Sequence, residues 1–431
     1  MTTVQLENRQ LVHLATSIDE NGLLLMAAII RSTLLGLTNS ISLSMSRNRP
    51  RSIGALVIFS ILLLIYWNPR IHHNLSPQDY LPLIPEPASS PKLEGRFKDL
   101  ERRLEEHFNA AGQVVPERVY PYHALTQAQQ SRYSLLTEDD DGIFMFTTIT
   151  RQIQDQLPDL LAAILVVVHT LGATRVSFSF LEGPSTDLTP SVLKQVLLPF
   201  LISLNVPESR IRILTDSPKI DFTAGNRIEL LAELRNQALS PVWEETGEGG
   251  VGHKVKTIIM FNDVYLKAEH FLEVLYWHQV NGASITTGWD WWKRDPGYYY
   301  DIWVGRTIDS GDLFYPIDQT WWSPSDDLFR SSNPSKESFE LLEPFPVFSS
   351  WNGLAVLDAG PIVRRGVRFR RSDRAKGECA ASECTLICSD YWKVGAGRVQ
   401  VIPSIQVRWV GGDVSSYRRS HANHELSTFP V

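Results

Sequence analysis

A carboxylate directly follows a strongly apolar segment near the middle of the chain. Residues 257–264 read TIIMFNDV, so Asn262 and Asp263 come where a buried strand would end. In open α/β sheets, ligands bind beyond the carboxyl ends of the strands, and an Asp there can hold a divalent metal that binds a diphosphate. The same residues could form a turn or cap a helix over 265–277. Taken alone, the motif favours the structural alternative.

Polar, turn-forming residues follow an earlier strand pattern in the same way. Residues 177–187 read SFSFLEGPSTD, which places Glu182 and Asp187 just after an apolar run. These carboxylates could accept hydrogen bonds from a ribose or from the edge of a base. An ordinary loop with an Asp cap explains the segment better when it is taken alone.

Two arginines lie on a predicted helix over residues 227–239, which read RIELLAELRNQAL. Arg227 and Arg235 are eight residues apart and fall near the same face, and guanidinium forks suit phosphate groups. The alternative is a solvated face, on which Glu229 and Glu233 are the ion-pair partners.

Aromatic residues stand beside carboxylates in the segments GWDWW, at 288–292, and YYDIWVGR, at 299–306. Aromatic rings stack on the apolar face of a pyranose, and carboxylates such as Asp290 and Asp301 accept bonds from its hydroxyls. The pattern therefore suits a sugar site, although some of these rings must belong to the core.

The three cysteines of the chain fall in one segment, ECAASECTLIC at 378–388, and their spacing is not that of a zinc site. A luminal compartment would favour one disulfide among them, with the pairing left open. Glu383, in the same segment, is a candidate catalytic or acceptor-binding carboxylate. A basic run over 364–376 could close over a nucleotide diphosphate or form a solvated loop.

The elements that must position these residues alternate along the chain. Periodicity predicts an amphipathic helix over 93–111. Beyond it, further helices are expected over 152–161, 193–204 and 227–239, and strands over 165–169, 175–181, 210–214 and 256–261. Such alternation indicates an α/β layered domain with a mixed, mostly parallel sheet.

Composition narrows the class of protein. The chain has 431 residues, a net charge of −7 and 12 Trp, 13 Tyr and 18 Phe. An acidic balance argues against a nucleic-acid binder, and so many aromatic residues argue against overall disorder.

A single apolar segment at 53–67, IGALVIFSILLLIYW, contains no charge and follows three arginines. It is shorter than an average spanning helix, but a thin early-secretory bilayer would accommodate it, and the arginines place the N-terminus in the cytosol. A buried helix or a cleaved signal is the alternative. The expected organisation is a cytosolic tail (1–52), a transmembrane signal anchor (53–67), a Pro-rich stem (68–92), a helical neck (93–139), a catalytic domain (140–411) and a polar tail (412–431).

Taken in order, these motifs resemble the fungal cryptococcal mannosyltransferase family, the capsule-associated α-1,3-mannosyltransferases. The resemblance covers about residues 140–410 and includes FPVFSSWNGLAVLDA at 345–359. It implies a single-pass type II Golgi membrane enzyme with a luminal, GT-A-like nucleotide-sugar domain. It also implies transfer of mannose from GDP-mannose to a mannoside glycan, with retention of configuration and with a divalent metal, manganese.

The resemblance also implies roles for individual residues. The donor would be bound by Glu182, Asp187, Arg227, Arg235 and Asn236, and the acceptor by Trp351 and Asn352. Asp290, Asp301 and Glu383 would be catalytic. Asp263 and Asn262 would hold the metal, and here the chain departs from the usual Asp-x-Asp because Asn262 replaces the first carboxylate.

Two other functions remain open at this point. One is a non-catalytic, sugar-binding accessory protein for glycan assembly or export. The other is a glycoside hydrolase that uses the carboxylates Asp290, Asp301 and Glu383. The stem-anchor layout and the arginine helix fit a nucleotide-sugar donor better than a hydrolase.

Overall fold

The structure is a computed structural model that describes residues 90–122, 124–138, 142–215, 221, 223, 225–243, 252–293, 297–318, 320 and 323–409. All of these belong to one compact unit, Ile84–Val431. The predicted cytosolic tail, anchor and polar C-terminal tail, and nearly all of the stem, lie outside the described residues. Within the described ranges, no helix is long and apolar enough to span a membrane.

The first half of the sheet is parallel. Its strands are β1 (Ile143–Thr150), β2 (Val176–Glu182), β3 (Ile211–Leu214) and β4 (Val255–Phe261), in the spatial order β3-β2-β1-β4. β1 and β2 are buried along almost their whole length, and β4 is buried over its second half, as expected for parallel strands covered on both faces. This half confirms the strands predicted over 175–181, 210–214 and 256–261.

The second half is mixed and continues the same sheet in the order β9-β5-β10-β8-β7. β9 is antiparallel to both β4 and β5, whereas β10 is parallel to β5. The sheet is therefore mixed and mostly parallel, as the sequence predicted. The bounds are β5 Ile285–Lys293, β6 Tyr298–Tyr299, β7 Arg306–Thr307, β8 Phe345–Ser349, β9 Leu354–Asp358 and β10 Val399–Arg408.

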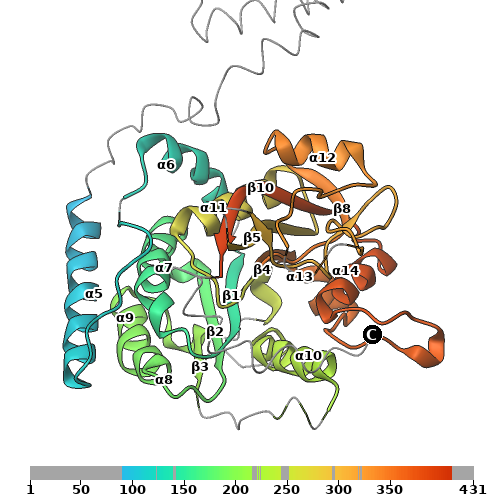
Figure 1. Cartoon of the computed structure of the whole chain (residues 1–431). Coiled ribbons are helices and arrows are strands. Elements are labelled where there is room, and N and C mark those ends of the chain that lie inside the picture. Colours follow the sequence, from blue (N-terminus) through green and yellow to red (C-terminus); the bar gives the residue numbers. More distant parts are fainter. Residues whose placement is uncertain are drawn as a thin grey trace, which may run out of the picture. The chain divides into compact units, whose positions relative to one another are not determined.

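Helices cover both faces of the sheet (Figure 1). One hydrophobic core joins the sheet to α5 (Pro91–Ala110), α7 (Leu157–Leu171) and α11 (Ala268–Val280). The other core joins the opposite face to α10, α13 and α14. The remaining bounds are α6 Gln127–Tyr133, α8 Thr189–Val192, α9 Leu198–Ser203, α10 Arg227–Ala238, α12 Asn333–Glu340, α13 Ala359–Arg365 and α14 Glu383–Lys393.

Two outcomes concern the predicted elements. The helix over 93–111 is confirmed as α5, whose buried face (Leu93, Phe97, Leu100, Leu104 and Phe108) packs against α7. The strand predicted over 165–169 is wrong, because α7 runs through it to Leu171. Nearly every side of α7 is buried, so its valine-rich run lacks a polar face, and periodicity alone cannot separate such a helix from a buried strand.

Candidate active site

The polar residues that follow the strands meet at one edge of the sheet. β1, β2 and β4 are parallel, so Glu182 at the end of β2 lies at the same edge as Asn262, which follows β4. β9 is antiparallel and begins where β4 ends, with Leu354 opposite Phe261. The turn that precedes β9, which contains Trp351 and Asn352, therefore joins this edge. It is the edge at which open α/β sheets bind their ligands.

A buried arginine lies at the centre of this edge. Arg235 and Glu383 are 5% and 3% exposed, and Nε of Arg235 donates to Oε1 of Glu383 at 3.1 Å. Nη1 of Arg235 also donates to Oδ1 of Asn262 at 3.5 Å. The guanidinium lies over the ring of Trp351, 4.8 Å from its centroid. Desolvating two charges is costly, so a buried pair of this kind is a candidate functional site.

Helix ends bring the two charges together. α14 begins at Glu383, and the hydroxyl of Ser382 caps the helix by accepting from the Cys384 N–H at 3.0 Å. A carboxylate in the first turn of a helix is stabilised by the helix dipole. Arg235 lies in the last turn of α10, where the dipole favours a cation, and α10 contacts α14.

A loop residue with a left-handed backbone holds the next carboxylate. The backbone N–H of Asn352, at φ 57°, donates to Oδ2 of Asp301 at 2.7 Å. The Asn352 amide is fully buried: Nδ2 donates to the Gly288 carbonyl at 2.7 Å, and Oδ1 accepts from the Tyr299 hydroxyl at 2.8 Å. Asn tolerates this conformation better than most residues. Asn352 thus fixes the turn that orients Asp301.

Asp290 lies behind Asp301 and is fully buried. Its Oδ2 accepts from Nε1 of Trp409 at 3.0 Å, whereas its Oδ1 has no hydrogen-bond partner. Burial raises the pKa of Asp290 well above its ordinary value, and the charge of Asp301 raises it further. Burial also raises the pKa of Asp301, to about 6, against the opposing effects of the Asn352 N–H and Arg235. The two carboxyls therefore titrate as a pair in which Asp290 retains a proton.

The predicted donor residues on β2 and its loop are held by local contacts. Glu182 is fully buried, and its Oε1 accepts from both the backbone N–H and the hydroxyl of Ser185. Its Oε2 has no partner, and burial raises its pKa. Asp187 accepts from the backbone N–H groups of Thr189, at 3.0 Å, and of Gln154, at 3.4 Å. Of these two carboxylates, Glu182 alone has a buried, unpartnered oxygen.

The arginine helix does not place its predicted residues together. Arg227, at the start of α10, is exposed, whereas Arg235 is buried in the site. Eight residues advance about 800° around a helix, so the two side chains are about 80° apart, enough to separate surface from interior. The side chain of Asn236 forms two hydrogen bonds with the backbone of Phe369: Nδ2 donates to the carbonyl at 2.8 Å, and Oδ1 accepts from the N–H at 3.0 Å. These bonds anchor the loop that follows α13 to α10.

The residues after β4 fit a metal only in part. Oδ1 of Asn262 accepts from Trp351 as well as from the cationic Arg235, so a cation would have to displace both donors. In the described part of the chain, no three His, Cys, Asp or Glu residues are grouped as a metal site. A divalent ion held mainly by donor phosphates and water needs only one or two protein carboxylates. Asp263 has the side chain that this role requires, whereas Asn262 has no carboxylate.

The predicted disulfide is wrong, because all three thiols are free. Cys384 and Cys388 lie one turn apart on α14, and each contacts an oxygen: Cys384 Sγ lies 3.5 Å from Oε1 of Glu383, and Cys388 Sγ lies 3.6 Å from the Ser350 carbonyl. Burial raises the pKa of both thiols, which favours the unreactive protonated form. Cys379 is exposed.

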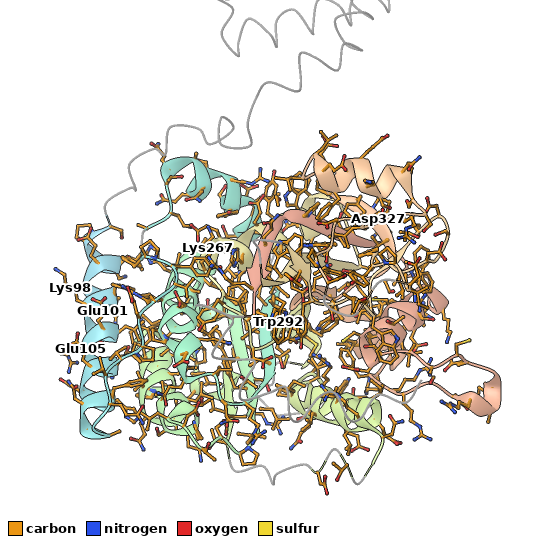
Figure 2. All side chains as sticks on the ribbon, viewed as in Figure 1. Lys98, Glu101, Glu105, Lys267, Trp292 and Asp327 are labelled. Carbon is orange, nitrogen blue, oxygen red and sulfur yellow. The ribbon has the colours of Figure 1, made fainter. Side chains whose placement is uncertain are left out.

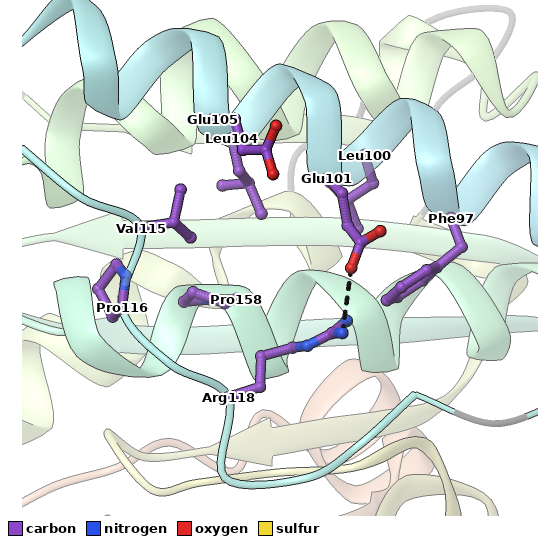
Figure 3. Close-up of a pocket in the computed structure, with 9 residues that line it drawn as sticks. All are labelled: Phe97, Leu100, Glu101, Leu104, Glu105, Val115, Pro116, Arg118 and Pro158. Carbon is purple, nitrogen blue, oxygen red and sulfur yellow. Dashed lines mark hydrogen bonds and ion pairs between the residues drawn. The ribbon is translucent and has the colours of Figure 1, made fainter.

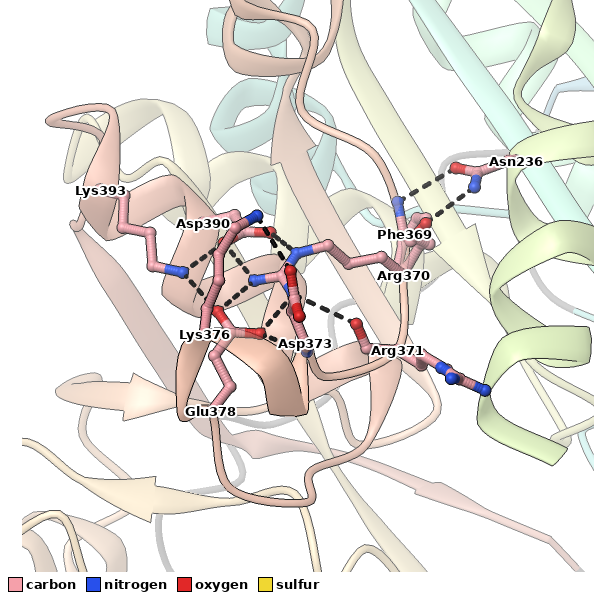
Figure 4. A network of polar contacts seen from close by, with 9 residues as sticks. All are labelled: Asn236, Phe369, Arg370, Arg371, Asp373, Lys376, Glu378, Asp390 and Lys393. Carbon is pink, nitrogen blue, oxygen red and sulfur yellow. Dashed lines mark hydrogen bonds and ion pairs between the residues drawn. The ribbon is translucent and has the colours of Figure 1, made fainter. Parts of the chain in front are cut away.

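The basic run over 364–376 contributes to a network of polar contacts around Arg370 (Figure 4). Arg370 donates to both carboxylate oxygens of Glu378 and of Asp390, at 2.6–2.9 Å. Lys393 bonds the same two carboxylates at 3.0 Å. Arg370 is therefore engaged within the protein, which favours the solvated-loop alternative for this residue.

Sequence reasoning missed two residues that complete the site. Trp409 donates a hydrogen bond to Asp290, and Tyr299 donates one to Asn352. Neither residue was predicted to belong to the site. Tyr299 stands in the aromatic segment already noted, which is the signal that could have found it. Trp409 stands at the end of β10, and only the parallel pairing of β10 with β5 brings it to Asp290.

A separate pocket of about 190 Å³ lies between α5, α7 and the segment after α5 (Figure 3). Arg118 bonds Glu101 across it at 3.1 Å. None of the candidate site residues lines this pocket.

Comparison with known proteins gives one strong relative. The α-1,3-mannosyltransferase CMT1 of Cryptococcus neoformans var. neoformans serotype D is 48% identical over 331 residues, which are 76% of this chain and 71% of that protein. Residues 143–390 match the model of the family Cryptococcal mannosyltransferase 1.

Solved structures are similar only weakly. TarS 1–349 of S. aureus in complex with UDP-GlcNAc is 12% identical, with a TM-score of 0.36 over 64% of this chain and 60% of that one. This chain thus spans less than two thirds of that structure. The mannosyltransferase PcManGT of Pyrobaculum calidifontis, in complex with GDP-Man and Mn2+, is 11% identical, with a TM-score of 0.33 over 76% of this chain and 71% of that one. The family match and the close relative, rather than these structures, show that the chain is a glycosyltransferase and belongs to the cryptococcal mannosyltransferase family.

Proposed function

We propose that this enzyme transfers mannose from GDP-mannose to a mannoside acceptor, with retention of configuration, and makes an α-1,3 linkage in glycan, capsule or cell-wall synthesis. Its membership of the family and its 48% identity to an α-1,3-mannosyltransferase support the reaction. The observation that carries the proposal is the buried Arg235, which lies between Glu383 and Asn262 at the ligand-binding edge of the sheet.

The geometry suits stabilisation of a departing diphosphate. As GDP leaves, negative charge develops on its phosphate oxygens, and a guanidinium excluded from water stabilises such charge strongly. Arg235 is held in place by Glu383 and Trp351 before any donor binds, so little reorganisation is needed. Phosphate oxygens would replace Asn262, whose bond to Arg235 is the longer one, as acceptors of Nη1.

A carboxylate is also needed for the sugar, which becomes oxocarbenium-like as its bond to the diphosphate breaks. Asp301 is partly exposed, next to the fully buried Asp290. Because Asp290 keeps its proton, Asp301 can carry the negative charge of the pair above a pH of about 6. Asp301 is thus the member of the pair that faces the sugar, and Glu383 balances the charge of Arg235.

A divalent cation, expected to be manganese, would be held by Asp263 together with the donor phosphates. When bound, it would neutralise part of the diphosphate charge. The enzyme is further proposed to lie in the Golgi membrane as a single-pass type II protein, with residues 53–67 as its anchor and its catalytic domain in the lumen. Protection of the catalytic domain from protease in sealed microsomes would test that orientation.

The reaction is tested by a donor screen on the purified full-length chain, with a panel of mannosides and with or without manganese. Mannose transfer from GDP-mannose that is lost in Asp263→Ala, in a variant that retains its melting temperature, is the expected result. Glu269→Ala, on α11, is the matched control for removal of a carboxylate. A fully active Asp263→Ala enzyme would exclude the metal role, and the absence of transfer from every nucleotide sugar would exclude the proposed function.

A further inference from the structure

Trp351 was predicted to bind the acceptor, but the structure gives it another position. It is 1% exposed, and Arg235 covers its ring. A ring in that position supports the arginine and presents no face to a sugar. Trp289 is likewise fully buried, among Tyr299 and Phe314. The aromatic surface that an acceptor glycan requires must therefore be sought elsewhere at this edge.

Three partly exposed rings stack in a row beside the carboxylate pair. Tyr300 lies 5.6 Å from Trp292, at an interplanar angle of 7°, and 3.9 Å from Trp409, at 29°. All three are half-buried, in contrast to Trp289 and Trp351. We call Trp292, Tyr300 and Trp409 the aromatic ladder; Figure 2 labels Trp292.

The ladder is rigid and is attached to the site. Trp409 donates its indole N–H to Asp290 at 3.0 Å, and its backbone N–H to the carbonyl of Trp291 on β5 at 3.1 Å. Tyr300 directly precedes Asp301, and its backbone N–H donates to the Asp290 carbonyl at 3.4 Å. Rings fixed in this way lose little conformational entropy when a ligand stacks on them.

On the basis of the proposed function, we propose that the aromatic ladder is the acceptor subsite, and that the apolar face of a mannoside pyranose packs against the exposed parts of its three rings. Aromatic faces suit the C–H face of a pyranose, while nearby polar groups orient its hydroxyls. The position next to Asp301 puts the bound sugar beside the carboxylate assigned to the reacting centre. Asp290 then has a second role, as the anchor of Trp409.

The test measures acceptor binding by the full-length enzyme. It compares two variants of Trp292 and one of Tyr300 with a control variant of a distant tryptophan. Trp292→Ala should raise the KM for a methyl α-mannoside acceptor roughly fivefold, because an aromatic stack contributes about 1 kcal/mol. Trp292→Phe should retain part of the affinity, and Tyr300→Ala should behave like Trp292→Ala. The KM for GDP-mannose and its hydrolysis without acceptor should change less than about twofold, as expected for uniform loss of acceptor binding.

The matched control is Trp392→Ala. Trp392 is 38% exposed and lines a pocket with Val399, at the start of β10. Trp409 follows the last residue of the same strand, whose partners on β5 run from Ile285 to Trp291, so the two ends of β10 are about 20 Å apart. This variant should leave the acceptor KM unchanged.

Two results would overturn the assignment: an unchanged acceptor KM in Trp292→Ala, or an equal rise in the donor KM, which would mark the ladder as a structural element. The proposed function and the ladder can fail separately. If the wild type transfers no mannose, titration calorimetry with methyl α-mannoside, in the absence of any donor, tests the ladder alone. Failure of the wild type to bind this sugar, or equal binding by Trp292→Ala, then refutes the subsite.

Discussion

Two arginine clusters of the molecule have opposite character. Arg235 is buried and forms an ion pair with Glu383. It lies near Asp290 and Asp301, whose pKa values are raised. Arg370 is 30% exposed and is fully engaged by Glu378 and Asp390. There, hydrogen bonds from Arg370 lower the pKa of Glu378. The first cluster contains groups held against their preferred ionisation, as is common at functional sites, whereas the second is satisfied within itself.

The largest effect is expected at the buried arginine. Arg235→Ala leaves Glu383 buried without a counter-charge, which should cost about 3–5 kcal/mol of stability. Arg235→Lys keeps the charge and loses the planar fork, and transfer should fall roughly 100- to 1,000-fold. Urea unfolding and steady-state transfer from GDP-mannose measure the two effects. Wild-type transfer by Arg235→Lys would place the diphosphate elsewhere.

A smaller effect on folding, but a large effect on rate, is expected at Asp301. Asp301→Asn keeps an acceptor for the Asn352 N–H and removes the negative charge, so transfer should fall by roughly 100-fold with little change in melting temperature. In the wild type, transfer should rise as pH increases through about 6, because the carboxylate form is required. A flat profile between pH 5 and pH 7 would contradict the role of Asp301.

Asp290→Asn should stabilise the protein at neutral pH. The folded state raises the pKa of Asp290, so it binds the proton more tightly than the unfolded state does. Below about pH 4, Asp290 is protonated in both the folded and the unfolded state, so its burial does not change stability with pH. Above about pH 4, the unfolded chain releases this proton first, and the free energy of unfolding falls. The variant should melt roughly 2 °C higher at pH 7 and show no gain at pH 3. An equal gain at both pH values would point to packing instead.

The smallest effect is expected in the exposed network, and its pH dependence has the opposite sign. Arg370→Gln should cost about 1 kcal/mol, since solvent screens a side chain that is 30% exposed. The pKa of Glu378 is lowered in the folded state, so its contribution is present at neutral pH and is lost as pH falls below about 4. Chemical unfolding of the variant and the wild type at pH 7 and pH 3 measures this difference in stability. Transfer activity should be unchanged in the variant. A loss that grows in acid would refute the network.

The comparison also separates what patterns predicted from what they could not. Three of the four strands in the parallel half of the sheet were predicted, because buried parallel strands appear as continuous apolar runs between helices, whereas β1 was missed. The strands of the mixed half, which includes the aromatic ladder, were not predicted. There, β5, β9 and β10 pair in mixed directions although they are far apart along the chain. The predicted strand within α7 failed for the related reason that a helix buried on all sides has no polar stripe.

The sequence by itself determined the family, the α/β class and the place of Asn262 and Asp263 after a buried strand, because these depend on local order along the chain. Only the tertiary structure decided which arginine is buried, which tryptophans are core and which carboxyl keeps its proton. Arg227 and Arg235 look alike in sequence, yet one is exposed and the other pairs with Glu383, 148 residues away. Desolvation and charge pairing arise from packing between distant segments, and no local pattern encodes them.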